Sequence, residues 1–281
     1  MPACDYTHGP IILETLRQRF REYYEEDDPS LYYHQDVQNV LYDDWWIMRY
    51  LNDHDGDENE SFKALIKCMK WRKLQGIREI EDNYFPEELF RLGAVFQYCH
   101  DKSGFPTFYI RLKLVRKCAE LQLLMKKYIA HCINKIDEET WGKGWALIID
   151  FGGIRLQHVD FEMAKYLLTT LKTYFPSGVA YGVCVDFPWV LRAFLNLIKS
   201  LIPANQRYLI KFSTRNDLRE YIDEVCLPDF MHGYCKRPYK GSAVVPYGSP
   251  NFNDFCHFEL GLPLEVCHKI TEIYRPFLPD D

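Results

Sequence analysis

Two short apolar runs separated by a segment of helical periodicity constrain the fold of this chain more than any other feature. The runs are residues 145–151 and residues 180–186, and both are rich in β-branched and aromatic side chains. Their length and composition are typical of buried strands. Residues 160–174 between them have helical spacing of apolar side chains and end at Tyr174-Phe175-Pro176. A strand, a helix and a second strand in this order predict a parallel pair joined by a crossover.

The same alternation extends along much of the chain. Further strands are predicted at residues 93–99, 105–112 and 208–212, a hairpin turn at residues 101–104, and helices at residues 116–138, 190–202 and 215–224. Strands separated by helices of ten residues or more predict a mostly parallel sheet flanked by helices, which is an α/β fold.

The N-terminal part of the chain shows helical patterns without strands. Helices are predicted at residues 11–26 and 36–54, and a third ends near Gly76. Asp57, with Glu60 three residues later, predicts a capping box at the start of that third helix. We therefore divide the chain into a helical lobe, an α/β domain and a C-terminal strap with one short helix. These three parts are residues 1–85, 86–235 and 236–281, and the short helix lies near residues 264–274.

Composition restricts the class of protein. The 281 residues carry 34 Lys and Arg against 40 Asp and Glu, a net charge of −6, and show no basic stripe of the kind that nucleic-acid binding needs. The first residues lack the basic start and apolar run of a signal peptide. No window approaches the roughly 18–20 apolar residues of a membrane span. The ten cysteines form no C-x-x-C pair. We expect a reduced, cytoplasmic protein that binds no nucleic acid.

Neither metal binding nor catalysis has a convincing signature. The acidic loop at residues 53–60 places Gly56 at position four, whereas a calcium-binding EF-hand loop needs glycine at position six. Only His232 and Cys235 have the spacing of a zinc-ligand pair. Nucleophile-elbow, zincin and phosphate-loop motifs are missing. Asp150 and Asp186 end two predicted strands and are interpreted as turn or cap residues. The sequence therefore predicts no metal and no enzyme.

The helix predicted at residues 190–202 is apolar on nearly every face. Its polar side chains fall on one narrow stripe, formed by Arg192, Asn196, Lys199 and Ser200. An ordinary surface helix is apolar over little more than about 100°. Two interpretations follow. The helix is either buried between the sheet and the N-terminal helices, or it covers a ligand cavity on one side and faces a membrane on the other. Aromatic residues make up 16% of the sequence, and they likewise allow two interpretations: they fill a large core, or some of them line an apolar cavity.

Six short motifs, in this order, resemble the CRAL-TRIO lipid-binding family. They are Trp71-Arg72-Lys73, residues 100–111, residues 148–153, Tyr174-Phe175-Pro176, residues 186–189 and Leu227-Pro228. The resemblance implies a helical lobe, a mostly parallel sheet flanked by helices, and a hydrophobic pocket whose gate is the 190–202 helix. It implies binding or transfer of a lipid, with peripheral membrane contact and no cofactor besides that lipid. The details at Phe187-Pro188-Trp189, Lys211-Phe212 and residues 216–221 are most similar to members that also carry a major-sperm-protein domain and a membrane anchor. Neither is in this sequence, so a location at the endoplasmic reticulum is expected only of a longer form.

Two positions depart from the pattern of the phosphoinositide-binding members of that family. Ser177 stands where those members have glutamate, and Leu209 stands where they have lysine. A phosphate group needs donors or cations to offset its desolvation, so these changes weaken the expectation of phosphoinositide binding. The glycine pair expected after Leu227-Pro228 is also reduced, since residues 230–233 contain only Gly233.

The residues that carry the hypothesis lie on the predicted strands and on the 190–202 helix. The predicted lipid-binding side chains are those of Tyr109, Ile149, Phe151, Val185, Phe187, Phe194, Leu195, Ile198 and Leu201. The predicted gate residues are Val190, Leu191, Phe194, Leu197, Ile198 and Ile202. Arg111 is expected either to hold a head group or to pair with Asp150, and we favour the pair. The rival interpretation is a protein-interaction module that keeps this fold without a lipid.

Overall fold

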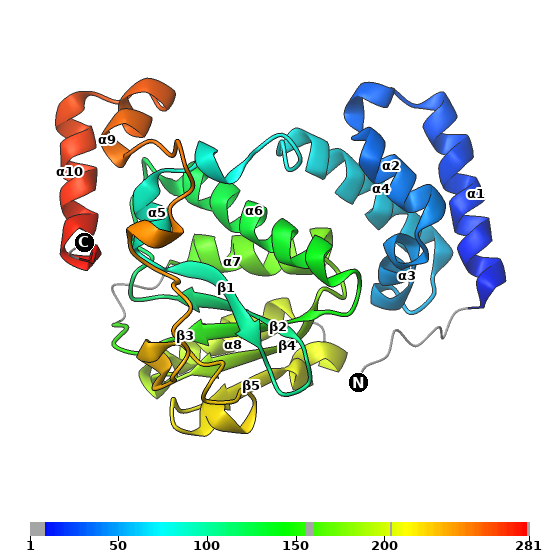
Figure 1. Cartoon of the computed structure of the whole chain (residues 1–281). Coiled ribbons are helices and arrows are strands. Elements are labelled where there is room, and N and C mark those ends of the chain that lie inside the picture. Colours follow the sequence, from blue (N-terminus) through cyan, green and yellow to red (C-terminus); the bar gives the residue numbers. More distant parts are fainter. Residues whose placement is uncertain (1–8, 156–159, 203, 280–281) are drawn as a thin grey trace.

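A five-stranded mixed sheet forms the centre of the molecule in the computed structural model, which describes residues 9–155, 160–202 and 204–279 (Figure 1). Its strands are β1 (Val95–His100), β2 (Pro106–Arg111), β3 (Trp145–Asp150), β4 (Val179–Val185) and β5 (Ile210–Ser213). They lie in chain order. The β1–β2 hairpin is antiparallel, and the three remaining pairs are parallel. The predicted mostly parallel sheet is confirmed.

Three crossover helices cover one face of this sheet. They are α6 (Gln122–Thr140), α7 (Phe161–Thr169) and α8 (Arg192–Leu201). Because the strand order follows the chain order, right-handed crossovers place all three helices on the same side. Alternate strand residues point to this face, as Leu147 and Ile149 of β3 do. We call it the helical face of the sheet.

A long segment with little regular structure covers the opposite face. Tyr109, Ile148 and Val183 point to this side and pack against residues 218–239. The helix predicted at residues 215–224 is wrong, because only a 3₁₀ turn forms, at Asp217–Glu220. The side chain of Arg215 is bound to Asp150 and Asp186 at the strand ends, and this pairing holds the start of the segment against the sheet.

Four helices form the N-terminal lobe around an apolar cluster of their own. They are α1 (Pro10–Glu26), α2 (His34–Tyr42), α3 (Asp44–Asp53) and α4 (Glu58–Leu74). The single helix predicted at residues 36–54 is wrong. It breaks at Asp43, whose carboxylate accepts a hydrogen bond from the amide of Trp45 and caps α3. The predicted cap of α4 is confirmed, since Asp57 accepts hydrogen bonds from the amides of Asn59 and Glu60.

The C-terminal residues pack beside the sheet on the side away from the N-terminal lobe (Figure 1). They contain α9 (Phe252–Asp254), which continues as a π-helical turn at Phe255–Glu259, and α10 (Leu264–Tyr274), which confirms the predicted short helix. A further helix, α5 (Glu87–Arg91), precedes the sheet. The helix predicted from residue 116 begins six residues later. Residues 115–118 have no helical structure, and the Arg116 guanidinium lies 4.0 Å from the centre of the Phe277 ring.

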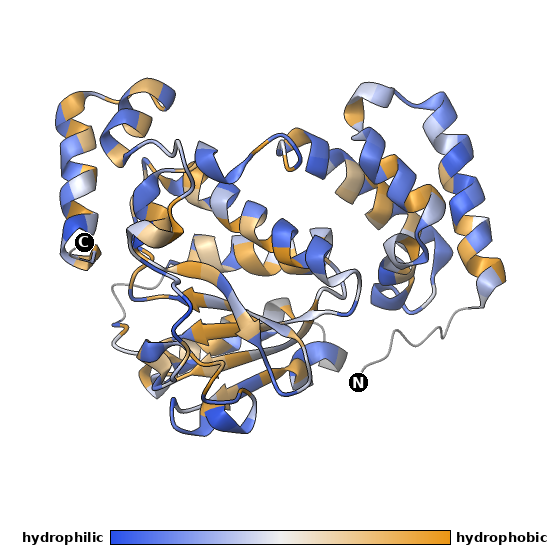
Figure 2. Cartoon of the chain, in the orientation of Figure 1, coloured by the Kyte–Doolittle hydropathy of each residue, from blue (hydrophilic) through white to orange (hydrophobic). Residues whose placement is uncertain are grey.

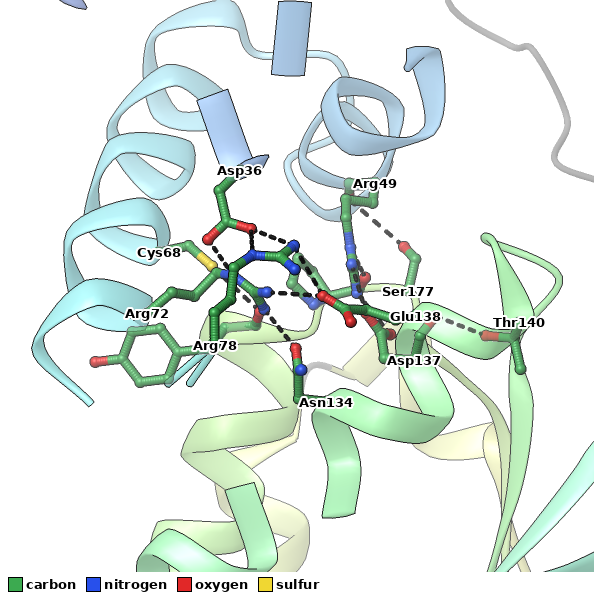
Figure 3. A network of polar contacts seen from close by, with 12 residues as sticks. Asp36, Arg49, Cys68, Arg72, Arg78, Asn134, Asp137, Glu138, Thr140 and Ser177 are labelled. Carbon is green, nitrogen blue, oxygen red and sulfur yellow. Dashed lines mark hydrogen bonds and ion pairs between the residues drawn. The ribbon is translucent and has the colours of Figure 1, made fainter. Parts of the chain in front are cut away.

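Buried ion pairs join the N-terminal lobe to α6 (Figure 3). Arg49 of α3 makes two hydrogen bonds to the carboxylate of Asp137, at 2.8 and 3.0 Å, and a third to the carbonyl of Pro176. Both paired side chains are about 2–3% exposed. Burial alone would lower the pKa of Arg49, but the charge and hydrogen bonds of Asp137 outweigh it, so the pKa is raised. The guanidinium therefore stays charged inside the protein.

A second buried cluster lies beside this pair. Arg72 of α4 donates to the carboxylate of Asp36 at 2.8 Å and to the side-chain oxygen of Asn134 on α6, also at 2.8 Å. Arg78 binds the other oxygen of Asp36 and, with Arg72, the carboxylate of Glu138. Because buried charges are stable only when paired, these contacts fix how the N-terminal lobe sits on α6.

Apolar residues gather on the strands and on the inner faces of the helices, while the outer faces are polar (Figure 2). Across the residues that the structure describes, no helix combines the length and the apolar character that crossing a bilayer requires.

Candidate ligand-binding cavity

A cavity of about 770 Å³ lies between the sheet and the three helices of its helical face. Its floor is formed by side chains of four strands. These residues are Ile110, Leu147, Ile149, Ala180, Gly182, Cys184 and Ile210. Pockets for small organic ligands typically measure about 300–1,000 Å³, so this one is large enough to enclose a sizeable apolar molecule.

Helices α7 and α8 supply the walls and the cover. Phe194, Leu195 and Ile198 of α8 line the cavity, while Arg192 and Asn196 of the same helix are exposed to solvent. Met163 and Leu167 come from α7, and Leu171 comes from the π-helical turn that follows it at Thr170–Tyr174. The described large apolar side chains of α8 therefore face the cavity, and this favours the interpretation of that helix as a cavity cover.

Small side chains on β4 leave the space open beneath α8. A Cβ atom built on Gly182 would have only the carbonyl oxygen of Leu147 nearby, at 3.8 Å. The flanking floor residues, Ala180 and Cys184, are also small. Their neighbours Tyr181 and Val183 point to the opposite face and are buried there. The β4 sequence thus places its small residues on the cavity side only.

The N-terminal lobe closes one end of the cavity. Trp45, Met48 and Arg49 of α3 line it, together with Asn52 and Asp53. The indole of Trp45 packs so tightly on Gly142 that a Cβ there would lie 2.1 Å from the ring. Gly142 also has a φ of +76°, so glycine is required for two independent reasons. This end of the cavity is built from contacts between residues almost one hundred positions apart.

The first half of α6 contributes Gln122, Met125 and Ile129 to the lining of the cavity. Gly142, two residues after the end of that helix, lines the cavity as well. Polar groups lie at both ends. Asp53 accepts a hydrogen bond from the side-chain amide of Gln206 at 3.2 Å. At the other end, Glu162 pairs with Lys126 at 2.7 Å, and Asp160 caps α7.

The strand floor of the cavity carries no charged side chain among the described lining residues. Cys184 is the one floor residue with a titratable group in this region, and burial raises the pKa of its thiol to about 12. The thiol is therefore neutral at physiological pH and behaves as a small apolar group. The interior suits a long apolar chain.

Most of the predicted lipid-binding residues lie together in this cavity. Ile149, Phe151, Phe187, Phe194, Leu195 and Ile198 all line it, and so does the gate residue Ile202. The gate residue Leu191 is buried under α8 beside Phe187, whereas Val190 is 82% exposed. The side chains of Leu197 and Leu201 fall outside the described residues. Whether any of these residues contacts a lipid stays a prediction.

Tyr109 and Val185 require correction. Both point to the opposite face of the sheet, where they are fully buried among Tyr98, Ile148 and Leu227. Successive residues of a strand point to opposite faces of the sheet. Both faces of this sheet are covered, so both sets of side chains are apolar, and composition does not reveal which set faces the cavity. Sequence reasoning also missed the lining residues of α3 and α7. The helical spacing of Leu167 and Leu171 could have identified them as lining residues, but no local sequence pattern predicts that Trp45 lines the cavity.

The two strand-end aspartates serve the fold. Asp150 accepts hydrogen bonds from the amide of Gly152 at 2.8 Å and from Arg215 at 3.0 Å. The Asp186 carboxylate oxygen Oδ2 lies 2.9 Å from Nε of Arg215. The interpretation as a turn-bonding residue is confirmed for Asp150, whereas Asp186 binds the amide and the guanidinium of Arg215, which is 29 residues further along the chain. The expected pair between Arg111 and Asp150 is wrong, because Arg215 binds Asp150 and the Arg111 guanidinium stacks 4.0 Å from the centre of the Phe230 ring. Burial lowers the pKa of Arg111.

Ser177 and Leu209, the two departures from the phosphoinositide pattern, both line the cavity. Ser177 has a left-handed backbone, with φ of +59°, and its hydroxyl lies 3.5 Å from the carbonyl oxygen of Arg49. Three lysines also lie along the rim, and all are exposed: Lys117, Lys143 and Lys172.

Comparison with known proteins agrees with this architecture. The crystal structure of Sfh5 superposes with a TM-score of 0.57 at 14% sequence identity, covering 93% of this chain and 96% of that one, so the fold is shared. Protein real-time of Drosophila pseudoobscura pseudoobscura is 25% identical over an alignment of 223 positions that covers 71% of this chain and 33% of that protein. Sec14 cytosolic factor of Schizosaccharomyces pombe is 22% identical over 218 residues, covering 70% of this chain and 76% of that protein.

The chain spans about a third of the length of the first curated relatives that it matches. The sequence model of the CRAL/TRIO domain matches residues 90–233, which is just over half of the chain and includes the whole sheet. This chain therefore belongs to the CRAL/TRIO domain family, whose members are generally lipid-binding and lipid-transfer proteins.

Proposed function

We propose that this protein binds one lipid in the cavity beneath α8 and carries it between membranes. The observation that supports this most is the largely apolar cavity of about 770 Å³ between α8 and the sheet. A protein interior is normally packed without voids larger than a water molecule, so an unfilled space of this size favours a ligand. We propose no catalytic activity, because Asp150 and Asp186 are both bound by Arg215.

The volume of the cavity also suits a lipid. About 770 Å³ lies in the upper part of the range of about 300–1,000 Å³ that pockets for small organic ligands occupy. The apolar strand floor suits an acyl chain, and the polar groups at the two ends of the cavity offer partners for a polar group of the ligand.

We further propose that the polar group of the ligand is not an inositol phosphate. Ser177 and Leu209 offer no charge at the cavity lining, and the rim lysines are exposed, so solvent and salt weaken their attraction for phosphate. In a competition assay against a bound fluorescent lipid, a neutral diacylglycerol should displace the probe better than a phosphoinositide of the same acyl chains. Preferential displacement by the phosphoinositide contradicts this proposal.

Contact with a membrane is proposed to occur at the start of α8. Trp189 is 65% exposed and Val190 is 82% exposed, although both are apolar. Tyr208, close to the end of α8 in sequence, is exposed as well. Exposed aromatic and aliphatic side chains beside the cover of the cavity favour insertion into the membrane interface, where tryptophan is stable.

Replacing both Trp189 and Val190 with aspartate should weaken binding to phosphatidylcholine vesicles by at least about tenfold, because the substitution removes roughly 1.5 kcal/mol or more of apolar burial and adds charge. Co-sedimentation measures the effect. The matched control is Tyr247→Asp, since Tyr247 is fully exposed on the C-terminal strap. Equal binding by the Trp189/Val190 variant and the control is the outcome that would refute membrane contact here.

Transfer itself is tested by moving a fluorescent phospholipid from donor to acceptor vesicles. The protein should raise the transfer rate in proportion to its concentration, and the Trp189/Val190 variant should not. A protein that leaves the rate at its spontaneous value, and takes up no probe, favours the rival function of an interaction module without a lipid.

We also propose a cytoplasmic protein with peripheral membrane association, divided near residues 85 and 235 as the sequence predicts. The motifs at residues 187–189 and 216–221 support a relationship to motile sperm domain-containing protein 2. If the chain functions within a longer anchored form, that form should fractionate with the endoplasmic reticulum. Immunoblotting of cell fractions with an antibody against this chain tests both points.

A further inference from the structure

Two cysteine side chains meet on the face of the sheet opposite the cavity. Cys99 belongs to β1, and Cys235 lies in the segment that crosses that face. Their Sγ atoms are 3.5 Å apart, although the residues are 136 positions apart in the chain. Of the nine cysteines that the structure describes, these are the two whose sulfur atoms touch. A disulfide bond is about 2.05 Å long, so a shift of roughly 1.5 Å joins them.

The backbone around both residues is held in place. The amide of Cys235 donates to the carbonyl of Leu227 at 3.2 Å. The hydroxyl of Tyr98, the residue before Cys99, donates to the carbonyl of Arg237 at 2.8 Å. The carbonyl of Cys99 accepts a hydrogen bond from Thr107 at 2.9 Å. The two sulfur atoms are therefore brought together by contacts that do not depend on the sulfur atoms themselves.

The surroundings make the two thiols unequal. Burial raises the pKa of Cys235, but the Tyr98 hydroxyl, the amide of Arg237 and the charge of Arg237 outweigh it, so the pKa is lowered. Burial, and secondly the hydrogen bond with Cys235, raise the pKa of Cys99 to about 11. Both side chains are partly exposed, and Tyr234 and Lys236 next to Cys235 are exposed. Cys235 is therefore the better attacking thiolate, and small reagents reach it.

We propose that Cys99 and Cys235 form a reversible redox pair that a small-molecule disulfide, such as glutathione disulfide, converts to an internal disulfide bond. The Cys235 thiolate attacks one sulfur of the reagent, and one glutathione thiolate leaves. The Cys99 thiolate then attacks the Cys235 sulfur, and the second glutathione leaves. The two protons of the protein thiols are taken up by the two leaving thiolates. The protein loses two electrons and the reagent gains them.

Oxidation would tie the segment at residues 227–241 to the sheet. Phe230 and Tyr239 of this segment pack against Phe96 of β1 and cover the buried Tyr109. In the reduced protein these contacts are noncovalent. A bond between Cys99 and Cys235 removes the freedom of the segment to detach, so amide hydrogen exchange within residues 227–241 should slow in the oxidised protein.

The test uses the full chain, treated with glutathione disulfide under native conditions, alkylated, and digested without reduction. The expected product is a cross-linked peptide pair containing Cys99 and Cys235, and the intact mass falls by that of two hydrogen atoms. Thioredoxin or dithiothreitol should restore both thiols. Recovery of both cysteines as alkylated or singly glutathionylated residues overturns the proposal.

Three variants separate this pair from its neighbour Cys226, which is partly buried in the same apolar cluster. Cys99→Ser and Cys235→Ser should each abolish the cross-link, whereas Cys226→Ser should leave it intact. A serine variant that fails to fold gives no information. We therefore also measure, in the unmodified chain, whether the Cys99 and Cys235 thiols are lost together during treatment with glutathione disulfide. A cross-link between Cys226 and Cys235 in that chain contradicts the assignment.

Discussion

A phenylalanine at position 182 is expected to abolish lipid binding without harming the fold. The Cβ of residue 182 points into the cavity, with its nearest neighbour, the carbonyl oxygen of Leu147, at 3.8 Å. Gly182 does not have a left-handed backbone, and aromatic residues favour strands more than glycine does. The ring would then occupy the space beneath α8 that a lipid chain needs. Binding of a phospholipid with a fluorescent acyl chain should fall by at least about tenfold, or ~1.4 kcal/mol.

Gly182→Ala provides the matched control, because one methyl group removes little of the cavity. It should bind the fluorescent lipid nearly as well as the unmodified chain. Thermal unfolding of both variants should be equal to or slightly above that of the unmodified chain, since replacing glycine in a strand favours the folded state by about 0.5–1 kcal/mol. Undiminished binding by Gly182→Phe, with an intact fold, means that the ligand site lies elsewhere.

The largest loss of stability is expected from Asp137→Ala. This substitution leaves the guanidinium of Arg49 buried without its carboxylate, 2% exposed at the end of the cavity. Removing one partner of a buried ion pair costs about 3–5 kcal/mol. Urea unfolding, followed by circular dichroism, measures the change in the free energy of unfolding.

Two further variants identify the cause. The double variant Arg49→Met with Asp137→Ala should be more stable than Asp137→Ala alone, because it removes the unpaired charge. Glu272→Ala breaks the pair between Glu272 and Arg275, whose side chains are 61% and 73% exposed, and should cost less than about 1 kcal/mol. If Asp137→Ala lowers the free energy of unfolding by no more than Glu272→Ala does, the pair between Arg49 and Asp137 does not hold the N-terminal lobe.

Much of the fold follows from local sequence patterns. Strands β2, β3 and β4 are short, apolar and bounded by turns, so their existence and parallel order are predictable. The predictions fail where the contacts of one polar side chain determine the local backbone structure. Asp43 breaks a helix whose apolar periodicity continues through it, and the ion pairs of Arg215 hold residues 215–224 outside a helix. The ion pairs of Arg215 involve residues distant in the chain, whereas the Asp43 cap is a local contact that overrides the apolar periodicity.

The cavity was predictable only in part. The apolar faces of α8 identify it as a cover, and Phe194 and Ile198 line the space below it. The floor was not predictable in detail, because both faces of a covered parallel sheet are apolar. For this reason the sequence does not reveal that Tyr109 points away from the cavity. Trp45 and Met48 reach the cavity because the helical lobe packs on α6. That packing depends on ion pairs that cannot be predicted from a local sequence pattern.

Native mass spectrometry of the purified chain, followed by solvent extraction, tests most directly whether the space under α8 holds a lipid. We expect a species heavier than the polypeptide by the mass of one lipid, and an extract that contains that lipid. The Gly182→Phe variant, purified in parallel, should show the polypeptide mass alone. An unmodified chain that carries nothing after purification, and takes up nothing from vesicles, would contradict the account.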